Sequence, residues 1–306
     1  VDYFVEGRPE YSKQSFETDQ FRPEIAGLAV TPAAGFEPLA MGPRKICCRR
    51  AAMELRPNSL INLGIGLPGG IGSVADEEGI SHLFTLSMEC GPLGGIPLGG
   101  IDFGAAVNPE AMYRMADILQ IYDGGALDMA VLGFAEADRQ GNVNAHNFHG
   151  RTVGPGGFID ITQNAKKLCF IGTFTAGKQE VGLKDDGLVI HTQGPQKKFI
   201  QKVESITFSG VEALRKGQEV LYITERAVFR LEKGGLTLIE IARGVDLQND
   251  ILDQMEFTPV VPDDLRIMDR RLFREGPMGL NPENVEKLGP AYEFWRDLRT
   301  KKDNEN

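Results

Sequence analysis

The chain has little of what marks a nucleic-acid-binding, membrane-spanning or secreted protein. Its 43 acidic residues outnumber its 33 Lys and Arg residues, so the net charge is −10 and no basic excess is available for nucleic acid. No apolar run reaches the roughly 18 residues that cross a bilayer, and no secretion signal opens the chain. We therefore expect a cytoplasmic protein that binds neither nucleic acid nor a membrane, although a local basic patch can still receive a phosphorylated ligand.

Cysteine is equally scarce, with four residues in 306. These cysteines lack the paired spacing of a zinc site and are too few for the disulfide framework of a chain this long. The sequence also has no internal repeat of fixed period and no low-complexity block. Because 42% of the residues are hydrophobic, we expect a sizeable core in one large or two medium domains.

Short apolar strands, glycine turns and helices alternate from residue 44 onward. Strands are expected at 59–63, 84–88, 129–134, 168–172 and 220–224. Helices are expected at 44–55, 71–78 and 109–116. This alternation predicts an α/β fold with an open, largely parallel sheet and flanking helices. Outside the pattern we expect a hairpin of residues 183–191 with 198–203, and a few short helices after Glu240.

The two ends of the chain differ from its centre. Residues 1–6 are expected to form a strand. Residues 7–43 contain prolines that break any regular element, so we expect a connector that wraps over a surface, with a disordered tail as the alternative. Residues 274–306 are expected to form a helical tail whose polar end, from residue 299, is frayed.

Two glycine-rich loops follow expected strands, at the edge where parallel sheets bind ligands. The loop at 64–70 suits an anion because glycine lets backbone N–H groups approach closely, although a tight structural turn explains it equally well. It lacks the residues of a P-loop and the spacing of a dinucleotide fingerprint. The second loop begins at Glu89. A carboxylate between an apolar strand and bare amides is partly desolvated yet held ionised, which suits a nucleophile, and a solvated loop glutamate is the alternative.

The segment that begins at Glu89 resembles the catalytic motif of family I coenzyme A transferases, in the propionate and acetate branch. It reads ECGPLGGIP from residue 89 and GGIDFGA from residue 99. Further family motifs are matched by NLGIGLP at 62–68, YDGG at 122–125, GGFIDI at 156–161, GTFTAG at 172–177 and TERAVF at 224–229. The resemblance extends from the first residue to about residue 273.

This resemblance implies the open α/β fold that CoA-transferases share with some sugar-phosphate isomerases. It implies transfer of coenzyme A from a short-chain acyl-CoA to a free carboxylic acid, with Glu89 as the nucleophile that becomes a glutamyl-CoA thioester. Coenzyme A is then substrate and covalent intermediate, with no permanently bound cofactor and no metal. CoA binding is assigned to Gly64, Ile65, Gly66, Leu67, Pro68 and Gly91. The backbone amides of Gly156 or Gly157 are candidates for stabilising the oxyanion.

Several polar residues lie near these motifs without matching them. Cys90 stands where the family more often has a small or amide residue, and we expect a small buried side chain without a catalytic role. His146 and His149 are expected on the substrate side of the site or on the surface. The lysine pairs at 166–167 and 197–198 are expected to be solvated, with a contact to a CoA phosphate as the alternative.

The resemblance is to the second, glutamate-bearing half of a family whose members combine two homologous halves, fused or as two subunits. Residues 1–43 resemble the end of the first half and the connector, and residues 44–273 resemble the catalytic domain. The first residue is Val and no first-half signature is present, so we expect a partner half, fused or separate, in a homo- or hetero-oligomer. The alternatives are an acyl-CoA hydrolase on the same scaffold and a noncatalytic CoA-binding subunit.

Overall fold

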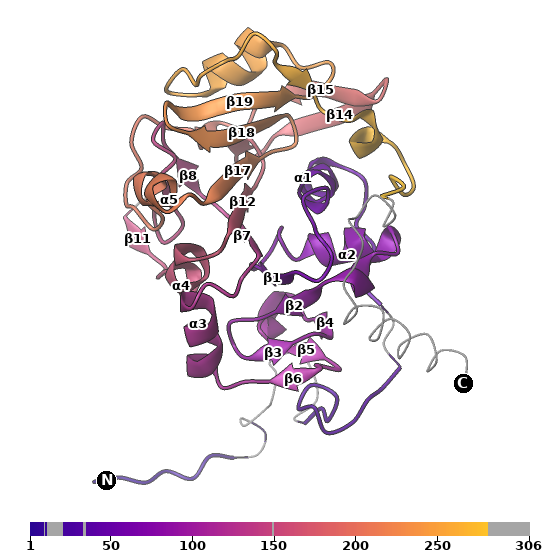
Figure 1. Cartoon of the computed structure of the whole chain (residues 1–306), viewed down its shortest axis with the longest axis vertical. Coiled ribbons are helices and arrows are strands. Elements are labelled where there is room, and N and C mark those ends of the chain that lie inside the picture. Colours follow the sequence, from indigo (N-terminus) through magenta and orange to yellow (C-terminus); the bar gives the residue numbers. More distant parts are fainter. Residues whose placement is uncertain (9, 11–20, 33–34, 149, 281–306) are drawn as a thin grey trace.

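A ten-stranded sheet forms the centre of the computed structural model, which describes residues 1–8, 10, 21–32, 35–148 and 150–280. The strands lie in the order β20-β19-β18-β17-β12-β7-β1-β2-β3-β6. In Figure 1 the sheet extends along the long axis of the molecule, with helices on both sides. None of the helices in the described ranges has the length and apolar character needed to span a bilayer.

The five central strands are mutually parallel. They are β2 (Thr85–Ser87), β1 (Leu60–Leu63), β7 (Met129–Gly133), β12 (Lys167–Ile171) and β17 (Glu219–Ile223). Their sequences are nearly continuous apolar runs, as expected for strands that are covered on both faces. All five expected strands are confirmed, with each boundary within one residue of its expected position.

The outer strands are mostly antiparallel to their neighbours. On one side β18 (Ala227–Glu232) and β19 (Gly235–Ile241) are antiparallel, and β20 (Arg266–Ile267) is parallel to β19. On the other side β3 (Pro92–Leu93) and β6 (Ala111–Met112) are antiparallel. The expected α/β class with an open, largely parallel sheet is therefore confirmed, and the parallel part lies at the centre.

Helices cover the two faces of the sheet (Figure 1). One face carries α1 (Pro43–Ala52) and α2 (Gly70–Glu77), and the other carries α3 (Met115–Asp123), α4 (Phe158–Gln163) and α5 (Gly210–Lys216). Each face has its own apolar core, with Ile46 and Val74 in the first and Ile118 and Ile161 in the second. The carboxyl ends of the parallel strands lie between these two cores.

Small two-stranded sheets follow the carboxyl ends of the central strands. They pair β4 (Ile96–Pro97) with β5 (Ala106–Val107), β8 (Glu136–Ala137) with β9 (Val143–Asn144), β10 (Asn147–Phe148) with β11 (Arg151–Thr152), β13 (Thr175–Ala176) with β16 (Gln196–Lys197), and β14 (Glu180–Lys184) with β15 (Gly187–Thr192). Single helical turns occur at Ser81–Leu83, Gly100–Asp102, Leu247–Ile251, Leu252–Gln254 and Arg270–Phe273. The last three confirm the short helices expected after Glu240.

Two other expected elements, the strand at 1–6 and the helix at 109–116, are wrong. Residues 1–6 form no strand, and Tyr3 is 90% exposed. Residues 109–116 do not form one helix, because Tyr113 N–H donates to Gly91 O at 2.9 Å and the segment becomes edge strand β6. The helix α3 begins only at Met115.

A hairpin is present, but both expected strands are wrong, because the turn lies inside the first of them, 183–191. Its strands are β14 and β15, joined by Asp185 and Asp186 with φ of 52° and 57°. Two consecutive residues with positive φ form the tight turn that suits a two-residue hairpin. Residues 198–203 form no strand, although Phe199 makes an isolated bridge to Ala137.

The segments before α1 and after residue 273 are held against the same face. Phe36 and Leu39 lie where a Cβ atom at Gly72 or Gly70 of α2 would collide with them, at 2.3 and 2.6 Å. At the other end, Arg49 donates to the carbonyl oxygens of Arg274 and Gly276. Glu78 accepts from the N–H groups of Met278 and Leu280. Residues 274–280 contain no helix, and the rest of the expected helical tail lies outside the described residues.

Candidate active site

Glu89 lies immediately beyond β2, in a turn closed by a hydrogen bond from Gly91 N–H to Met88 O at 2.9 Å. The carboxylate is half-buried, and its Oε2 is buried without a hydrogen-bond partner among the described residues. Buried polar atoms nearly always have partners, so an orphaned carboxylate oxygen calls for an explanation. A partly desolvated carboxylate oxygen without a hydrogen-bond partner has the environment that suits a nucleophile.

Gly157 lies directly against this carboxylate. A Cβ atom built on Gly157 would lie 3.2 Å from Glu89 Cγ and 3.3 Å from Glu89 Cβ. The main chain at Gly157 therefore lies so close to Glu89 that a Cβ atom there would push the Glu89 side chain away by a few tenths of an ångström. Gly156 precedes it with φ of 54° and open space around its missing side chain. Neither amide donates to another described residue in the hydrogen bonds of this structure, so both N–H groups are available to a ligand.

The loop from Gly64 to Pro68 has an outer and an inner part. Ile65 is 64% exposed, and Gly66 has φ of 81° with no atom within 4 Å of its missing Cβ. Gly64 is packed against β7, where a Cβ would lie 2.8 Å from Leu132 Cδ2. Leu67 O accepts from Cys48 Sγ at 3.2 Å. Two of the five expected CoA-binding residues thus face outward, and the remaining residues anchor the loop.

A cavity of about 760 Å³ adjoins this loop. Its walls come from the loop after β1, the connector before α1 and the second glycine-rich loop. The lining includes Gly64, Gly66, Phe36, Leu39, Leu98 and Met88. Because Met88 precedes Glu89 in the chain, the cavity lies next to the segment that carries Glu89. Its size lies within the range of pockets that hold small ligands.

Gly91 has a structural explanation that needs no ligand. Its φ is 127°, and a Cβ there would lie 2.0 Å from Tyr113 O. The backbone of the edge segment crosses at that point, so no side chain fits. A direct contact of Gly91 with coenzyme A stays a prediction.

A buried group of three polar residues, Asn62, Ser87 and Tyr122, supports the turn that carries Glu89. Asn62 and Ser87 face each other in the register of β1 and β2, and Asn62 Nδ2 donates to Ser87 O at 3.1 Å. The same amide lies 3.4 Å from Tyr122 Oη, and Asn62 and Tyr122 are fully buried. Burial raises the pKa of Tyr122 to about 12, and the negative charge of Glu89 adds to the rise. Sequence reasoning missed this group, although two polar residues at matching positions of apolar strands were a visible signal.

Cys90 is exposed, so the expectation of a buried side chain is wrong. Its sulfur lies 2.6 Å from where a Gly104 Cβ would be. Partial desolvation raises the pKa of the Cys90 thiol, and the adjacent Glu89 charge raises it further. The thiol therefore stays protonated at neutral pH, and a thiol is a weaker nucleophile than a thiolate.

The other polar residues singled out from the sequence lie elsewhere. The ring nitrogens of His146 lie 2.6 Å from Thr207 Oγ1 and 3.2 Å from Ser205 Oγ, and His149 lies outside the described residues. In the ranges that the structure describes, no group of three or more His, Cys, Asp or Glu is placed to hold a metal ion.

Only part of the expectation for the lysine pairs is correct. Lys166 is exposed and pairs with Asp128 at 2.6 Å, and Lys167 lies between Glu54 and Glu219. These two lysines are at the amino end of β12, opposite the edge that carries Glu89. Lys197 is exposed, but Lys198 is only 7% exposed, so the expectation of a solvated side chain is wrong for Lys198.

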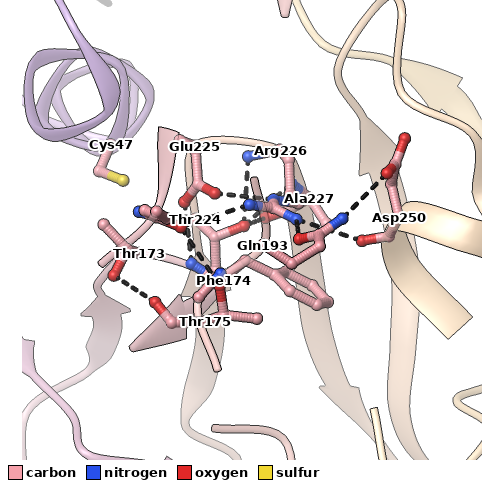
Figure 2. Close-up of polar contacts among 12 residues, drawn as sticks. Cys47, Thr173, Phe174, Thr175, Gln193, Thr224, Glu225, Arg226, Ala227 and Asp250 are labelled. Carbon is pink, nitrogen blue, oxygen red and sulfur yellow. Dashed lines mark hydrogen bonds and ion pairs between the residues drawn. The ribbon is translucent and has the colours of Figure 1, made fainter. Parts of the chain in front are cut away.

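A second polar cluster occupies the carboxyl ends of β12 and β17 (Figure 2). Glu225 and Arg226 are fully buried, and Arg226 Nε lies 2.7 Å from Glu225 Oε1. Glu225 Oε2 accepts from Phe174 N–H at 2.8 Å, and Arg226 Nη1 donates to Gln193 Oε1 at 2.6 Å. The motifs at 172–177 and 224–229 are therefore joined by a saturated network that fixes two loops to each other.

The chain is similar to bacterial CoA-transferases. Acetate CoA-transferase YdiF of Escherichia coli K12 is 51% identical over 79% of this chain and 45% of its own length. Caffeate CoA-transferase of Acetobacterium woodii is 44% identical over 92% of this chain and 54% of its own length. The chain thus spans about half the length of these relatives. Acetate CoA-transferase subunit beta of Escherichia coli K12 is 30% identical over 68% of this chain and 89% of the subunit.

Solved structures agree with these relatives. The YdiF apoenzyme from Escherichia coli O157:H7 superposes with a TM-score of 0.79 at 46% identity, over 85% of this chain and 48% of that one. The thioester complex of YdiF with CoA gives 0.75 at 48% identity, over 80% and 47%. Glutaconate coenzyme A-transferase from Acidaminococcus fermentans, at 14% identity over 82% and 96%, shares the fold with a TM-score of 0.59. No family model matches the chain. With these relatives and this sheet, the chain belongs to the family I coenzyme A transferases.

Proposed function

We propose that the protein containing this chain transfers coenzyme A from a short-chain acyl-CoA to a free carboxylic acid, with Glu89 as the covalent nucleophile. The observation that carries the proposal is the half-buried Glu89 carboxylate, whose orphaned oxygen lies beside the bare main chain of Gly157. The names of YdiF and of caffeate CoA-transferase support the reaction class. A thioester complex with CoA is known for YdiF, which supports a covalent route.

In the first half-reaction, coenzyme A becomes attached to Glu89. One carboxylate oxygen attacks the thioester carbonyl of the acyl-CoA, and collapse of the tetrahedral oxyanion expels the CoA thiolate and leaves a mixed anhydride. The thiolate then attacks the glutamyl carbonyl, which releases the first acid as its carboxylate. The product is a thioester between Glu89 and coenzyme A, and no proton is gained or lost overall.

In the second half-reaction, the same steps run in reverse with another acid. Its carboxylate attacks the Glu89 thioester, expels the thiolate and forms a new mixed anhydride. The thiolate attacks the acyl carbonyl of this anhydride, so a new acyl-CoA leaves and the Glu89 carboxylate is restored. Each attack creates an oxyanion that needs nearby donors, and loss of one donor typically costs about 10²–10³ in rate. The amide of Gly157 is a suitable donor because Gly157 lies against Glu89, and the amide of Gly156, the preceding residue, is the second candidate.

The loop after β1 is the proposed contact for coenzyme A. Ile65 and Gly66 face outward at the rim of the cavity, while Leu67 and Pro68 anchor the loop. Remote binding energy from the nucleotide part of coenzyme A then positions the thioester at Glu89. Coenzyme A serves as substrate and intermediate in this scheme, without a resident cofactor or metal.

We further propose that this chain works with a second half, fused or separate, in a homo- or hetero-oligomer. The relatives are about twice as long, or carry a name that identifies them as one subunit. Residues 44–273 would form the glutamate-bearing domain, with residues 1–43 as the end of the preceding half and connector. Residues 274–306 would form a C-terminal tail.

Trapping of the covalent intermediate tests the proposal. The intact protein is incubated with an acyl-CoA without an acceptor acid, and peptides are analysed by mass spectrometry. A CoA-sized adduct on the peptide with Glu89, sensitive to hydroxylamine or borohydride, supports the route. Loss of acyl-CoA to water without dependence on acid would indicate a hydrolase, and CoA binding without any turnover would indicate a binding subunit. Either result overturns the proposal.

A further inference from the structure

Lys198 is a buried cation without a counter-ion among the residues that the structure describes. It is 7% exposed, whereas the adjacent Lys197 is exposed and donates to Met255 O at 3.1 Å. Within the described chain, no hydrogen bond or carboxylate ion pair to Lys198 Nζ is formed, and its contact is the Phe134 ring, 3.9 Å from the centroid. Burial of an ammonium without a paired anion is costly, so such a group needs a reason to be kept.

The amino group lies at the edge of the sheet that carries Glu89. Lys198 Nζ is 2.5 Å from where a Cβ of Gly172 would be, so it occupies the space above the bare main chain after β12. Phe134, whose ring it covers, follows β7. In open α/β sheets ligands bind beyond the carboxyl ends of the strands. Lys198 is therefore placed where a ligand arrives.

The neighbours of Lys198 do not neutralise it. Glu225 is the nearby carboxylate, but Arg226 at 2.7 Å and Phe174 N–H at 2.8 Å already occupy its two oxygens (Figure 2). Burial raises the pKa of the Cys47 thiol well above its usual value, so Cys47 supplies no anion. Glu225, Arg226 and Lys198 together leave one positive charge in excess.

The first turns of α1 connect this charge to the proposed CoA loop. Cys47 Sγ donates to Gly172 O at 3.5 Å, on the side of Lys198. The next residue, Cys48, donates to Leu67 O at 3.2 Å, on the side of the loop. The surroundings of Lys198 and the loop therefore contact neighbouring sides of the same helix. Arg44, exposed near the start of α1, adds a second cation close to Cys48.

We propose that Lys198 binds an anionic oxygen group of a substrate, either a phosphate of coenzyme A or the carboxylate of the acid. The inference rests on the proposed function and adds a substrate-binding residue to it. The incoming anion supplies the counter-ion that the protein leaves out, and its charge is recognised in a partly desolvated place where an ion pair is strong. Lys198 takes no part in bond making or breaking.

The test compares Lys198→Met with Lys197→Met in the intact protein. Methionine has nearly the volume of lysine without the buried charge, so we expect Lys198→Met to fold. Steady-state rates are measured with an acyl-CoA, with the same acyl group on pantetheine, and with varied acceptor acid. If Lys198 binds a phosphate, KM for acyl-CoA rises about 10- to 100-fold while KM for acyl-pantetheine is unchanged. If it binds the carboxylate, KM for the acid rises and both acyl donors keep their KM.

The pH dependence of KM is a second measurement that tests the role of Lys198. Desolvation lowers the pKa of Lys198 to about 8. Burial keeps the pKa values of the Cys47 thiol and the Tyr222 hydroxyl well above their usual range, so neither group loses its proton near that pH. The KM of the substrate that it binds should rise above pH 8 in the wild type and in Lys197→Met, and should stay flat in Lys198→Met.

Failure of the inference is separate from failure of the proposed function. Normal transfer by folded Lys198→Met, with all three KM values within twofold of wild type, overturns the role of Lys198 alone. A wild-type protein that transfers no coenzyme A overturns the proposed function. Calorimetric titration with coenzyme A and with the acid then decides for Lys198, because equal affinities in wild type and Lys198→Met overturn the inference there too.

Discussion

Glu89 and Glu225 both follow a parallel strand at the carboxyl edge of one sheet, but their surroundings are opposite. Glu225 is fully buried, and Arg226 and Phe174 N–H occupy its two oxygens. Glu89 is half-buried, has a buried oxygen without a partner in the described part of the chain and lies against the bare main chain of Gly157. A saturated carboxylate stabilises a fold, whereas an unsaturated one is available for chemistry. The comparison predicts that changes at Glu89 affect rate and changes at Glu225 affect stability.

The largest expected effect is on the rate of Glu89→Gln. The amide is a poor nucleophile, so CoA transfer should fall by more than about 10⁴-fold, as in other enzymes that lose a covalent nucleophile. Because Glu89 Oε2 has no partner among the described residues, thermal stability should change little. Stopped CoA transfer with an unchanged melting temperature supports the comparison. Full activity of Glu89→Gln contradicts it.

The reverse pattern is expected for Arg226→Met. Removal of one partner leaves Glu225 as an uncompensated buried charge, which typically costs about 3–5 kcal/mol of unfolding free energy. Denaturant unfolding measures the loss. The double variant Glu225→Leu/Arg226→Met is the matched control, and it should recover much of the stability because neither charge remains. A specific loss of transfer in a fully stable Arg226→Met protein would count against a structural role.

Gly157→Ala sharpens the comparison on the side of Glu89. The new Cβ would lie 3.2 Å from Glu89 Cγ, so the carboxylate must move by a few tenths of an ångström. Small misplacements at a reacting centre can cost about 10²-fold in rate. We expect kcat to fall by about 10- to 100-fold with little change in the KM of the acyl-CoA. Gly156→Ala has open space for its Cβ but a φ of 54° that favours glycine, so it shows how much of the effect comes from backbone strain without a collision with Glu89.

Lys198→Met extends the comparison of paired and unpaired charges to a buried cation. The pKa of Lys198 is about 8 in the folded state against 10.5 for a free lysine. Between these values the unfolded chain binds more protons, so stability falls as pH drops from 10.5 to 8 and the penalty is fully present below pH 8. Lys198→Met should therefore raise the melting temperature by a few degrees at pH 7 and leave it unchanged at pH 11. A lower melting temperature at pH 7 contradicts this.

The smallest effect is expected for Cys90→Ala. The thiol is exposed and its pKa is raised, so it competes poorly with the carboxylate beside it. Adduct formation and transfer rate should match wild type. A CoA adduct that maps to Cys90 would instead make the sulfur the nucleophile and remove the basis of the comparison.

Elements that rest on local patterns were predictable, and elements that rest on distant contacts were not. The central strands are continuous apolar runs that pack on both faces, so their sequences locate them. The segment at 109–116 has a helical pattern, but pairing with β3 and with Gly91 O makes its first part an edge strand. The hairpin depends on positive φ at Asp185 and Asp186, which acidic residues adopt less readily than asparagine or glycine.

The residues of the candidate site also fall into those that the sequence predicts and those that depend on distant contacts. Glu89 was predictable because strand, carboxylate and glycines are adjacent in the sequence. Gly157 was a weak candidate from the resemblance, and its approach to Glu89 depends on how α4 packs. Lys198 was expected in water because two consecutive lysines usually are exposed. Only the packing around Phe134 and Gly172 shows that one of them is buried.

The segment after residue 273 is held partly through its backbone, in addition to the buried Met278 side chain and the ion pair of Arg274 with Asp186. Arg49 contacts carbonyl oxygens at Arg274 and Gly276, and Glu78 contacts the N–H groups of Met278 and Leu280. Every amino acid has a main-chain carbonyl, and all but proline have the N–H. These hydrogen bonds therefore do not depend on which side chains the segment carries. Sequence drift in the segment is therefore tolerated wherever its side chains do not pack. Substitution of Arg49 or Glu78 would instead remove these hydrogen bonds to the segment.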